Sequence, residues 1–464
     1  MSMLKEERMG EFGCRITRMV FAAVVAACAL FTAQAGVYDV KDFGAKGDGV
    51  TKDTAAVQAA LDACAKTGGR VTVPSGTYLI GSIYLGDGTE LHLDKGATLL
   101  GSPDLGDYNA PDAYPQNWGS ANEGWSAKHL ILVIERCNVS ITGEGVIDGN
   151  GRAFFDDKPQ YFEKVCWRNG GINARGKRSE QRRPGPEIVF VECSDVEVRG
   201  VTFRDMSCWS CLFHGCENVV VGGVKVRNGI RNLNTDGFDV DSCRNVRIGD
   251  CDIITGDDAI AIRGNPARLK DPTKVCENVR VSNVVCRVQA VGVRVGVGNG
   301  TIRNVRISDM EIQESGRGLH VQCCYGKPKA AEKVGVDISD VVFERIVIRD
   351  TCDPITVTAG SPASTAYLRN IVFRDIRSES TLPPSIIGKG RTRPRDVLFT
   401  NCLFCVGKTV PGSRAEDKFD LKADGGMDTF IVKDADGLSV GNSSVRLLGH
   451  SAFSGDRPRR LSVR

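Results

Sequence analysis

The sequence predicts an all-β fold, a right-handed parallel β-helix with a capping helix at its N-terminal end. Asn or Asp followed by Val or Ile recurs along the chain, and alternating apolar residues follow each time. Such alternation is typical of short, half-buried strands. Helical periodicity is almost absent outside one segment, which excludes leucine-rich and helical solenoids. We therefore expect stacked β coils with turns about 4.8 Å apart.

The length of the chain agrees with a solenoid. Its 464 residues exceed the roughly 250–300 that a single globular core usually holds. A solenoid escapes this limit because each turn contacts only its neighbours, so the core lengthens without thickening. We expect one β-helix domain over residues 36–464. The net charge of +3 does not indicate nucleic acid or an anionic membrane as a partner, and we expect a monomer.

The N-terminus resembles an export signal. Two arginines precede the apolar run Met19–Phe31, and Ala33–Ala35 offers small residues at the cleavage spacing. The apolar run is shorter than the about 20 residues of a transmembrane helix. Residues 1–35 are therefore predicted to be a signal peptide, and the protein to be secreted or periplasmic. Lipid anchoring at Cys28 is the alternative.

One helix is predicted, from Thr54 to Ala65, with Asp53 or Thr51 as its N-cap. It is expected to cover the N-terminal end of the coil, because an open sheet edge there would invite aggregation. Its apolar positions are Ala55, Val57, Ala60 and Leu61.

The strand repeats run from Asn138 to Asp396. A charged segment at 156–186 interrupts them and is interpreted as a long loop beside a groove of the coil. The stretch after Lys408 has little periodicity, so no element is predicted there. The repeated dipeptides begin at Asn138, Asp195, Asn218, Asn245, Asn278, Asn304, Asp340, Asn370 and Asp396.

The chain has 18 cysteines, which in an exported protein usually indicates disulfides. Several of them share one position in the repeat, however, one or two residues before the recurring dipeptide. Free cysteine behaves as a small apolar residue, so we predict a buried column with few disulfides. These cysteines are Cys137, Cys193, Cys216, Cys243 and Cys276.

Two acidic segments on successive turns carry the candidate chemistry. They are Asn234-Thr235-Asp236 and Gly256-Asp257-Asp258. Their spacing is one turn, which places Asp236 beside Asp258. Glycoside hydrolysis uses two such carboxyl groups, which in an inverting enzyme stand about 6.5–9.5 Å apart. Repulsion between them raises the pKa of at least one group, which then stays protonated as the acid.

Turn capping is the simpler explanation of acidic residues, since Asp and Asn often cap turns between strands. It accounts for isolated residues such as Asp195 and Asp340. It does not account for Asp257 and Asp258 beside Asp236, because adjacent like charges destabilise a sheet. We therefore interpret these three as catalytic.

Other residues near the acidic segments are interpreted as structural. Asp239 and Asp241 follow the first segment, but strand alternation is expected to turn them elsewhere. Trp118, Trp125 and Trp209 fit packing better than stacking on sugars.

The acidic segments resemble the two acidic signatures of the polygalacturonases of glycoside hydrolase family 28. The opening from Tyr38 to Gly49 is similar to the N-terminal cap of that superfamily. The resemblance implies that Asp257 is the general acid, and that Asp236 and Asp258 hold and activate water. It also implies inversion of configuration, a pectin-like polysaccharide as substrate, and no metal or other cofactor.

Two further signatures of that family are altered. Ala290-Val291-Gly292 stands where the family has Gly-His-Gly, and His320-Val321-Gln322 stands where it has Arg-Ile-Lys, which grips the galacturonate carboxylate. A bidentate guanidinium is thereby lost. The substrate is expected to shift, to a rhamnogalacturonan or to a neutral or differently placed uronic sugar.

Arginines on nearby turns offer a partial compensation. If Val291 stacks on Asp258, Arg294 falls in the column of His320, and Arg263 falls in that of Gln322. The predicted substrate-binding residues are Asn234, Arg263, Arg294, His320 and Gln322.

Two other functions remain open. A β-helix polysaccharide lyase would use the acidic cluster to bind Ca²⁺ and would release unsaturated sugars. A non-catalytic carbohydrate-binding β-helix would explain the altered signatures, but it would not need three clustered aspartates.

Overall fold

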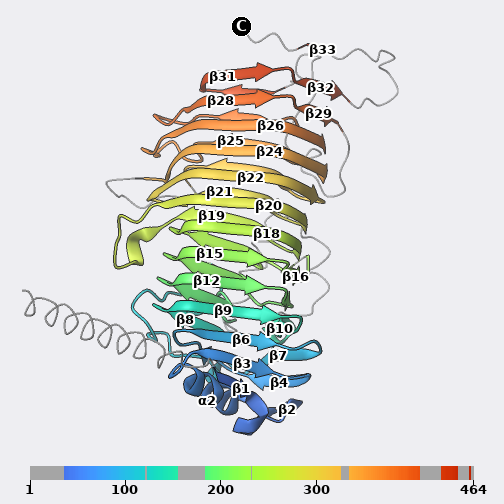
Figure 1. Ribbon diagram of the computed structural model, residues 1–464. Helices are drawn as coiled ribbons and strands as arrows, with labels where there is room; N and C mark the ends of the chain where they lie inside the picture. Colours follow the sequence, from blue (N-terminus) through green and yellow to red (C-terminus); the bar gives the residue numbers. More distant parts are fainter. Residues whose placement is uncertain are drawn as a thin grey trace, which may run out of the picture.

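The structure, a computed structural model, describes residues 36–120, 123–154, 183–230, 232–324, 334–407, 430–447 and 459–460. Almost every strand pairs in parallel with the strand one turn before it and the strand one turn after it (Figure 1). The strands form two hydrogen-bonded sheets, of 22 and 11 strands. The predicted parallel β-helix is thus confirmed.

The smaller sheet presents one strand per turn. Its strands are β5 (Ile83–Tyr84), β8 (Ile131–Ile134), β11 (Ile188–Val191), β14 (Cys211–His214), β17 (Phe238–Asp241), β19 (Ile260–Gly264), β21 (Val291–Gly298), β23 (Arg317–Gln322), β25 (Asp353–Thr358), β27 (Ser385–Ile387) and β30 (Ile431–Lys433).

The larger sheet supplies the remaining sides of each turn: β18 pairs with both β15 and β16, and β26 pairs with both β28 and β29, so one long strand covers the sides that two short strands cover elsewhere. Its strands are β1 (Gly36–Asp39), β2 (Asp48–Lys52), β3 (Gly69–Val73), β4 (Gly76–Ile80), β6 (Thr89–Leu93), β7 (Ala97–Gly101), β9 (Cys137–Gly143), β10 (Val146–Asp148), β12 (Ser194–Arg199), β13 (Thr202–Arg204), β15 (Glu217–Gly222), β16 (Lys225–Arg227), β18 (Arg244–Thr255), β20 (Cys276–Val288), β22 (Thr301–Gln313), β24 (Asp337–Thr351), β26 (Leu368–Ser380), β28 (Pro394–Thr400), β29 (Leu403–Val406), β31 (Asp436–Gly441), β32 (Ser444–Leu447) and β33 (Arg459–Arg460).

The recurring Asn or Asp marks a bend in each turn. All nine predicted repeat residues have φ between 51° and 59°, in the left-handed region that Asn and Asp tolerate best among residues with a side chain. Their side chains also bond along the stack: Asn245 Nδ2 donates to Asn218 Oδ1 at 3.1 Å, and Asn278 Nδ2 to Asn245 Oδ1 at 3.0 Å. The repeat therefore sets the bends and the register of successive turns.

The interior is a continuous apolar column with aligned side chains. Phe343, Phe373 and Phe399 stack with ring centroids 5.0 and 4.8 Å apart. The predicted cysteine column is present as well, since Cys216 and Cys243 are buried and each thiol faces a carbonyl of the preceding turn at 3.3 Å.

All five cysteines predicted for the column are free thiols. Cys193 and Cys276 belong to the same buried column. Cys137 is the exception. It is exposed, because it stands directly before the left-handed Asn138, whereas the others stand two residues before theirs.

Helix α2 (Thr54–Cys64) covers the N-terminal end of the coil, as predicted (Figure 1). The face of α2 that packs on the coil consists of the buried residues Val57, Ala60, Leu61 and Cys64. Ala55, which was expected on the apolar face, is exposed. The short 3-10 helices are η1 (Val40–Phe43), η2 (Leu105–Asp107), η3 (Gly151–Phe154) and η6 (Pro266–Arg268).

Asp53 occupies the N-cap position of α2, but its side chain makes no capping hydrogen bond. Its carboxylate instead accepts from the backbone N–H groups of Lys46 and Gly47, at 2.7 and 2.9 Å. Asp53 is thus the N-cap residue, one of the two predicted, but its side chain holds the loop before the helix and not the first N–H groups of the helix.

The C-terminal stretch, for which no element was predicted, adds one more turn: β30, β31 and β32 pair in parallel with β27, β28 and β29. The predicted signal peptide 1–35, including Cys28, lies outside the described residues, as does the 156–186 segment up to residue 182. In the part of the chain that the structure describes, no helix combines the length and the apolar character that a membrane crossing requires.

Candidate active site

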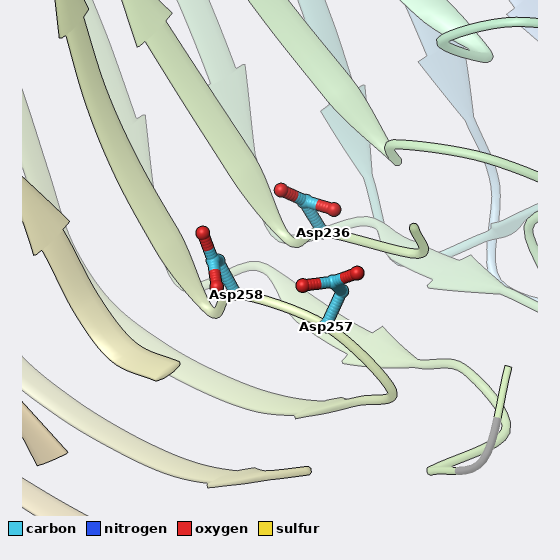
Figure 2. Close-up of side chains that lie close together, drawn as sticks. All are labelled: Asp236, Asp257 and Asp258. Carbon is cyan, nitrogen blue, oxygen red and sulfur yellow. The ribbon is translucent and has the colours of Figure 1, made fainter. Parts of the chain in front are cut away.

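Asp236, Asp257 and Asp258 converge from two neighbouring turns, just before β17 and β19 (Figure 2). The register pairs Phe238 with Ile260, and Gly237 N donates to Asp258 O at 2.9 Å. Asp236 therefore stands opposite Asp258, as the spacing predicted. One carboxylate oxygen of each aspartate lies within 4.8 Å of one from each of the others.

The local sequence explains how two turns approach so closely. A Cβ on Gly256 would lie 2.0 Å from Asn232 O, so only glycine fits before Asp257. Thr235 joins the turns, because its hydroxyl accepts from Gly256 N at 3.2 Å and its carbonyl accepts from the Thr255 hydroxyl. The paired acidic segments thus form one rigid unit.

The carboxylates are closer together than expected. An acid and a base that hold a water between them usually stand about 6.5–9.5 Å apart, whereas oxygens of these three groups approach within 4.8 Å. Asp236 and Asp258 occupy directly opposed positions on adjacent strands, where separation follows the strand spacing of about 4.8 Å. Their separation alone therefore does not predict the stereochemical outcome.

Arg294 balances the charge of Asp258. Its Nη2 donates to Asp258 Oδ1 at 3.1 Å and its Nε donates to Asp258 Oδ2, so the pair is bidentate. Arg294 stands opposite His320 in the sheet, as predicted, and its Nη1 lies 3.4 Å from His320 Nδ1. Burial and the nearby Arg317 and Arg294 hold the pKa of His320 well below its usual value, so the ring is neutral.

Arg263 contacts a fourth aspartate. Its Nε donates to Asp239 Oδ1 at 2.6 Å, its Nη2 donates to Asp236 Oδ2 at 3.3 Å, and its guanidinium lies 4.2 Å from the centre of the Trp209 ring. The expectation that alternation turns Asp239 away from the cluster is wrong. Asp236 precedes β17, so the alternation of side chains along β17 does not separate it from Asp239. Arg263 donates to both carboxylates and joins them.

The predicted alignment of Arg263 with Gln322 meets an irregularity. Gln322 pairs with Gly296 on the preceding turn, but the register between β19 and β21 shifts between Ile262 and Gly264. Within the described residues, no hydrogen bond or ion pair joins Arg263 to Gln322. Arg263 instead points to the aspartates.

Asn234 and Arg183 fix the position of Asp257. The backbone N–H of Asn234, at φ 55°, donates to Asp257 Oδ2 at 2.9 Å. The guanidinium of Arg183 donates to Asn234 Oδ1 at 2.8 Å, to Leu233 O at 2.9 Å and to Glu123 O at 3.0 Å. Arg183 is almost completely buried. The sequence did not single it out, because it lies 51 positions from Asn234 inside a segment interpreted as a loop.

The aromatic residues pack as expected. Trp125 contacts Trp118 and Trp209, with ring centroids 5.9 and 5.7 Å apart. Both Trp125 and Trp209 are buried. They form an apolar cluster beside the aspartates.

Burial and repulsion from neighbouring carboxylates raise the pKa of Asp236 and of Asp257. Burial first, and then Asp239, Asp257 and Asp258, hold the pKa of Asp236 well above its ordinary value. Burial and Asp258 raise the pKa of Asp257 to about 7, against the lowering effects of Arg294 and the Asn234 N–H. These carboxyls titrate as one unit, which therefore retains a proton near neutral pH.

The three carboxylates could also ligate a divalent cation, since oxygen ligands suit Ca²⁺ or Mg²⁺. However, Arg294 already donates to both oxygens of Asp258, and Arg263 donates to one oxygen of Asp236. Two guanidinium groups thus supply the positive charge that a cation would bring. The donor set fits a charge-balanced acid–base site better than a metal site.

Comparisons with known proteins identify the family of the chain. The family model described as "Glycosyl hydrolases family 28" matches residues 64–409. A probable polygalacturonase of Vitis vinifera is 28% identical over 299 residues, covering 62% of this chain and 57% of that protein. An exo-poly-alpha-D-galacturonosidase of Dickeya chrysanthemi is 31% identical over 277 residues, covering 52% and 45%. The chain thus spans about half the length of these two relatives.

Solved structures share the fold. The family 28 exopolygalacturonase of Yersinia enterocolitica superposes with a TM-score of 0.65 at 20% identity, covering 92% of this chain and 77% of that one.

Proposed function

The chain belongs to glycosyl hydrolase family 28, and we propose that it hydrolyses glycosidic bonds of a pectin-like polysaccharide with inversion of configuration. The convergence of Asp236, Asp257 and Asp258 within 4.8 Å is the observation that carries hydrolysis, whereas inversion is inferred from membership of the family. No structural requirement of a β-helix explains three buried acids at adjacent positions, because their repulsion opposes folding.

The general acid is Asp257. It is the most accessible of the three, 8% exposed compared with 2% for Asp236 and for Asp258, so it can reach the oxygen of the leaving sugar. Its pKa of about 7 keeps a proton available at neutral pH, which general acid catalysis requires. On cleavage this proton passes to the glycosidic oxygen, which leaves as a hydroxyl group.

Asp236 receives the proton of the attacking water. Its Oδ2 accepts from Arg263, whereas its buried Oδ1 has no hydrogen-bond partner among the described residues. A buried acceptor without a donor is costly, and a water molecule would satisfy it. Asp236 and Asp257 titrate together, so Asp236 acts as the base in the state in which Asp257 carries the proton. Asp258, held by Arg294, orients the same water.

The substrate differs from plain homogalacturonan. Arg263 and Arg294, which could have replaced the missing Arg-Ile-Lys grip, both direct their guanidinium groups at aspartates of the site. Neither is therefore free to hold a uronate carboxylate bidentately. Neutral His320 and Gln322, both on β23, fit hydroxyl groups better than a carboxylate. We propose a rhamnogalacturonan, or a neutral or differently placed uronic sugar, at this subsite.

Asp257→Asn tests the chemistry. We expect turnover to fall about 10²–10⁴-fold, since one positioned proton donor contributes that much, while polysaccharide binding persists. Asp195→Asn, at an exposed turn, is the matched control and should keep full activity. Unchanged turnover in Asp257→Asn would remove the acid assignment.

The product distinguishes the reaction classes. Hydrolysis gives new reducing ends of inverted anomeric configuration, seen by NMR, without absorbance from an unsaturated sugar. An EDTA-sensitive activity with that absorbance would establish a lyase instead. Binding without any cleavage would indicate a non-catalytic β-helix.

A panel of pectic oligosaccharides tests the substrate. We expect branched or rhamnose-containing chains to be cleaved faster than homogalacturonan. Strong homogalacturonan cleavage that depends on Arg294 would show that the arginines compensate for the missing grip. A polymer substrate also fits export by the signal peptide proposed at 1–35, which N-terminal sequencing of the secreted protein would test.

A further inference from the structure

Three arginines form a column on the larger sheet, away from the aspartates. Arg247 on β18 pairs in register with Arg280 on β20, which pairs with Arg306 on β22. All three are exposed. These strands lie on consecutive turns (Figure 1), so the cations repeat at the strand spacing of about 4.8 Å. We call these three residues the arginine column.

The charge of the column is largely uncompensated. Among the described residues, neither Arg247 nor Arg280 forms a hydrogen bond or an ion pair. Arg306 donates to Glu344 at 3.0 and 3.1 Å. Glu344 is shared, however, because Arg345 and Arg374 also lie within 3.1 and 3.7 Å of it. The column therefore carries a net positive charge.

Another column of charged residues, beyond Asn245, Asn278 and Asn304, shows the usual arrangement. There Arg244, Glu277 and Arg303 alternate in sign, with Glu277 lying 3.3 Å from Arg244 and 2.7 Å from Arg303. Alternation relieves the repulsion that like charges exert on neighbouring strands. The arginine column lacks this relief, although the protein as a whole carries a net charge of only +3.

Side chains next to the column along each strand add no negative charge. On one side lies the ladder of Asn245, Asn278 and Asn304, and on the other lie Ser282 and Ser308. Amides and hydroxyls of this kind suit the hydroxyl groups of a sugar.

We propose that the arginine column is a second polysaccharide-binding surface, which holds a stretch of chain with regularly spaced carboxylates. This inference rests on the proposed function, because a pectin-like substrate supplies such a stretch. It also explains how an acidic polymer is held when Arg263 and Arg294 at the site are paired with aspartates. The surface belongs to the larger sheet, whereas the aspartates precede strands of the smaller one, so the two can be tested separately.

The test uses polygalacturonate and the full chain carrying Asp257→Asn, so that the probe is not consumed. Arg247→Gln combined with Arg280→Gln removes two cations without breaking any hydrogen bond or ion pair of the described residues. We expect its affinity, measured by affinity electrophoresis at low salt, to fall about tenfold, since exposed ion pairs contribute up to about 1 kcal/mol each. The difference should shrink at 0.5 M salt.

The matched control is Arg244→Gln combined with Arg303→Gln, which changes the net charge equally on strands β18 and β22. We expect its affinity to stay within about twofold of the parent, because those charges are already paired. Equal losses in both double variants would show a general charge effect and overturn the proposal, as would no loss in Arg247→Gln/Arg280→Gln. Duplex DNA bound as tightly as polygalacturonate would also overturn it.

Catalysis separates the two proposals. With Asp257 restored, Arg247→Gln/Arg280→Gln should cleave short oligosaccharides at the parental rate. If the parent cleaves no polysaccharide but column-dependent binding remains, the hydrolase proposal fails and the binding surface stands. If the parent cleaves polysaccharide but the column variant binds polygalacturonate normally, the binding surface fails and the hydrolase proposal stands.

Discussion

The buried aspartates make stability depend on pH. The pKa of Asp257 rises to about 7 in the folded protein because burial and Asp258 disfavour its charge. Below pH about 4, this carboxyl is protonated in the folded and the unfolded chain alike. As pH rises toward 7, the unfolded chain releases the proton while the folded chain keeps it, so the free energy of unfolding decreases across this window.

Asp257→Asn should therefore stabilise the protein at pH 8 by about 2 kcal/mol relative to the parent, and change little at pH 4. The asparagine oxygen still accepts the Asn234 N–H, so that contact remains. Urea unfolding at both pH values measures the difference, with Asp195→Asn as the control. A stabilisation that is the same at both pH values would contradict this account.

Arg183 is a positioning residue for Asp257. Its guanidinium joins Glu123, Leu233 and Asn234, and Asn234 N–H in turn holds Asp257. Arg183→Lys keeps the charge but lacks the planar fork. We expect a loss of about 2–3 kcal/mol in stability, since buried hydrogen bonds to charged groups contribute about 1.5–3 kcal/mol.

The catalytic readout distinguishes positioning from general loss of stability. In folded Arg183→Lys, kcat should fall well below that of the parent while KM changes little, and the alkaline limb of the pH–rate profile, which reports the general acid, should move. A parental profile and kcat in the folded fraction would assign Arg183 a purely structural role.

At the scale of the elements, the bends between strands determine how the turns stack. Asn278 has φ 59°. Its amide donates to Asn245, and its oxygen accepts from Asn304 at 2.6 Å. Asn278→Ala loses both bonds and incurs left-handed strain of about 1–2 kcal/mol, whereas Asn278→Gly loses only the bonds. We expect the alanine variant to melt at a lower temperature than the glycine variant; the opposite order would exclude strain as the cause.

At the scale of the whole molecule, the stability of each turn depends on the turns packed against it. Each turn contacts only its neighbours, so unfolding can start at one end. Leu61 is completely buried where α2 covers the first turn. Leu61→Asp places an unpaired charge there and should detach the cap.

Hydrogen exchange measured by mass spectrometry would locate the effect of Leu61→Asp. We expect β1, β3 and β4 to lose protection first, while β17, β19 and β21 around the aspartates keep it longer. Simultaneous loss of protection throughout the coil would show that the protein unfolds as one unit.

The sequence alone determined the fold and the core of the candidate site. The period of Asn138 to Asp396 is visible because every turn must bend with a residue that tolerates positive φ, and the same constraint repeats along the chain. The pairing of Asp236 with Asp258 followed from the length of one turn, since register in a stacked coil is a matter of counting.

Only the tertiary structure decided which partners the charged groups take. Asp239 joins the site through Arg263, Arg294 neutralises Asp258, and Arg183 fixes Asn234. These contacts join residues tens of positions apart whose side-chain directions depend on loops and register shifts, which obey no period. Which charged groups pair depends on their distance in space. Where the backbone is irregular, that distance does not follow from the number of residues between them.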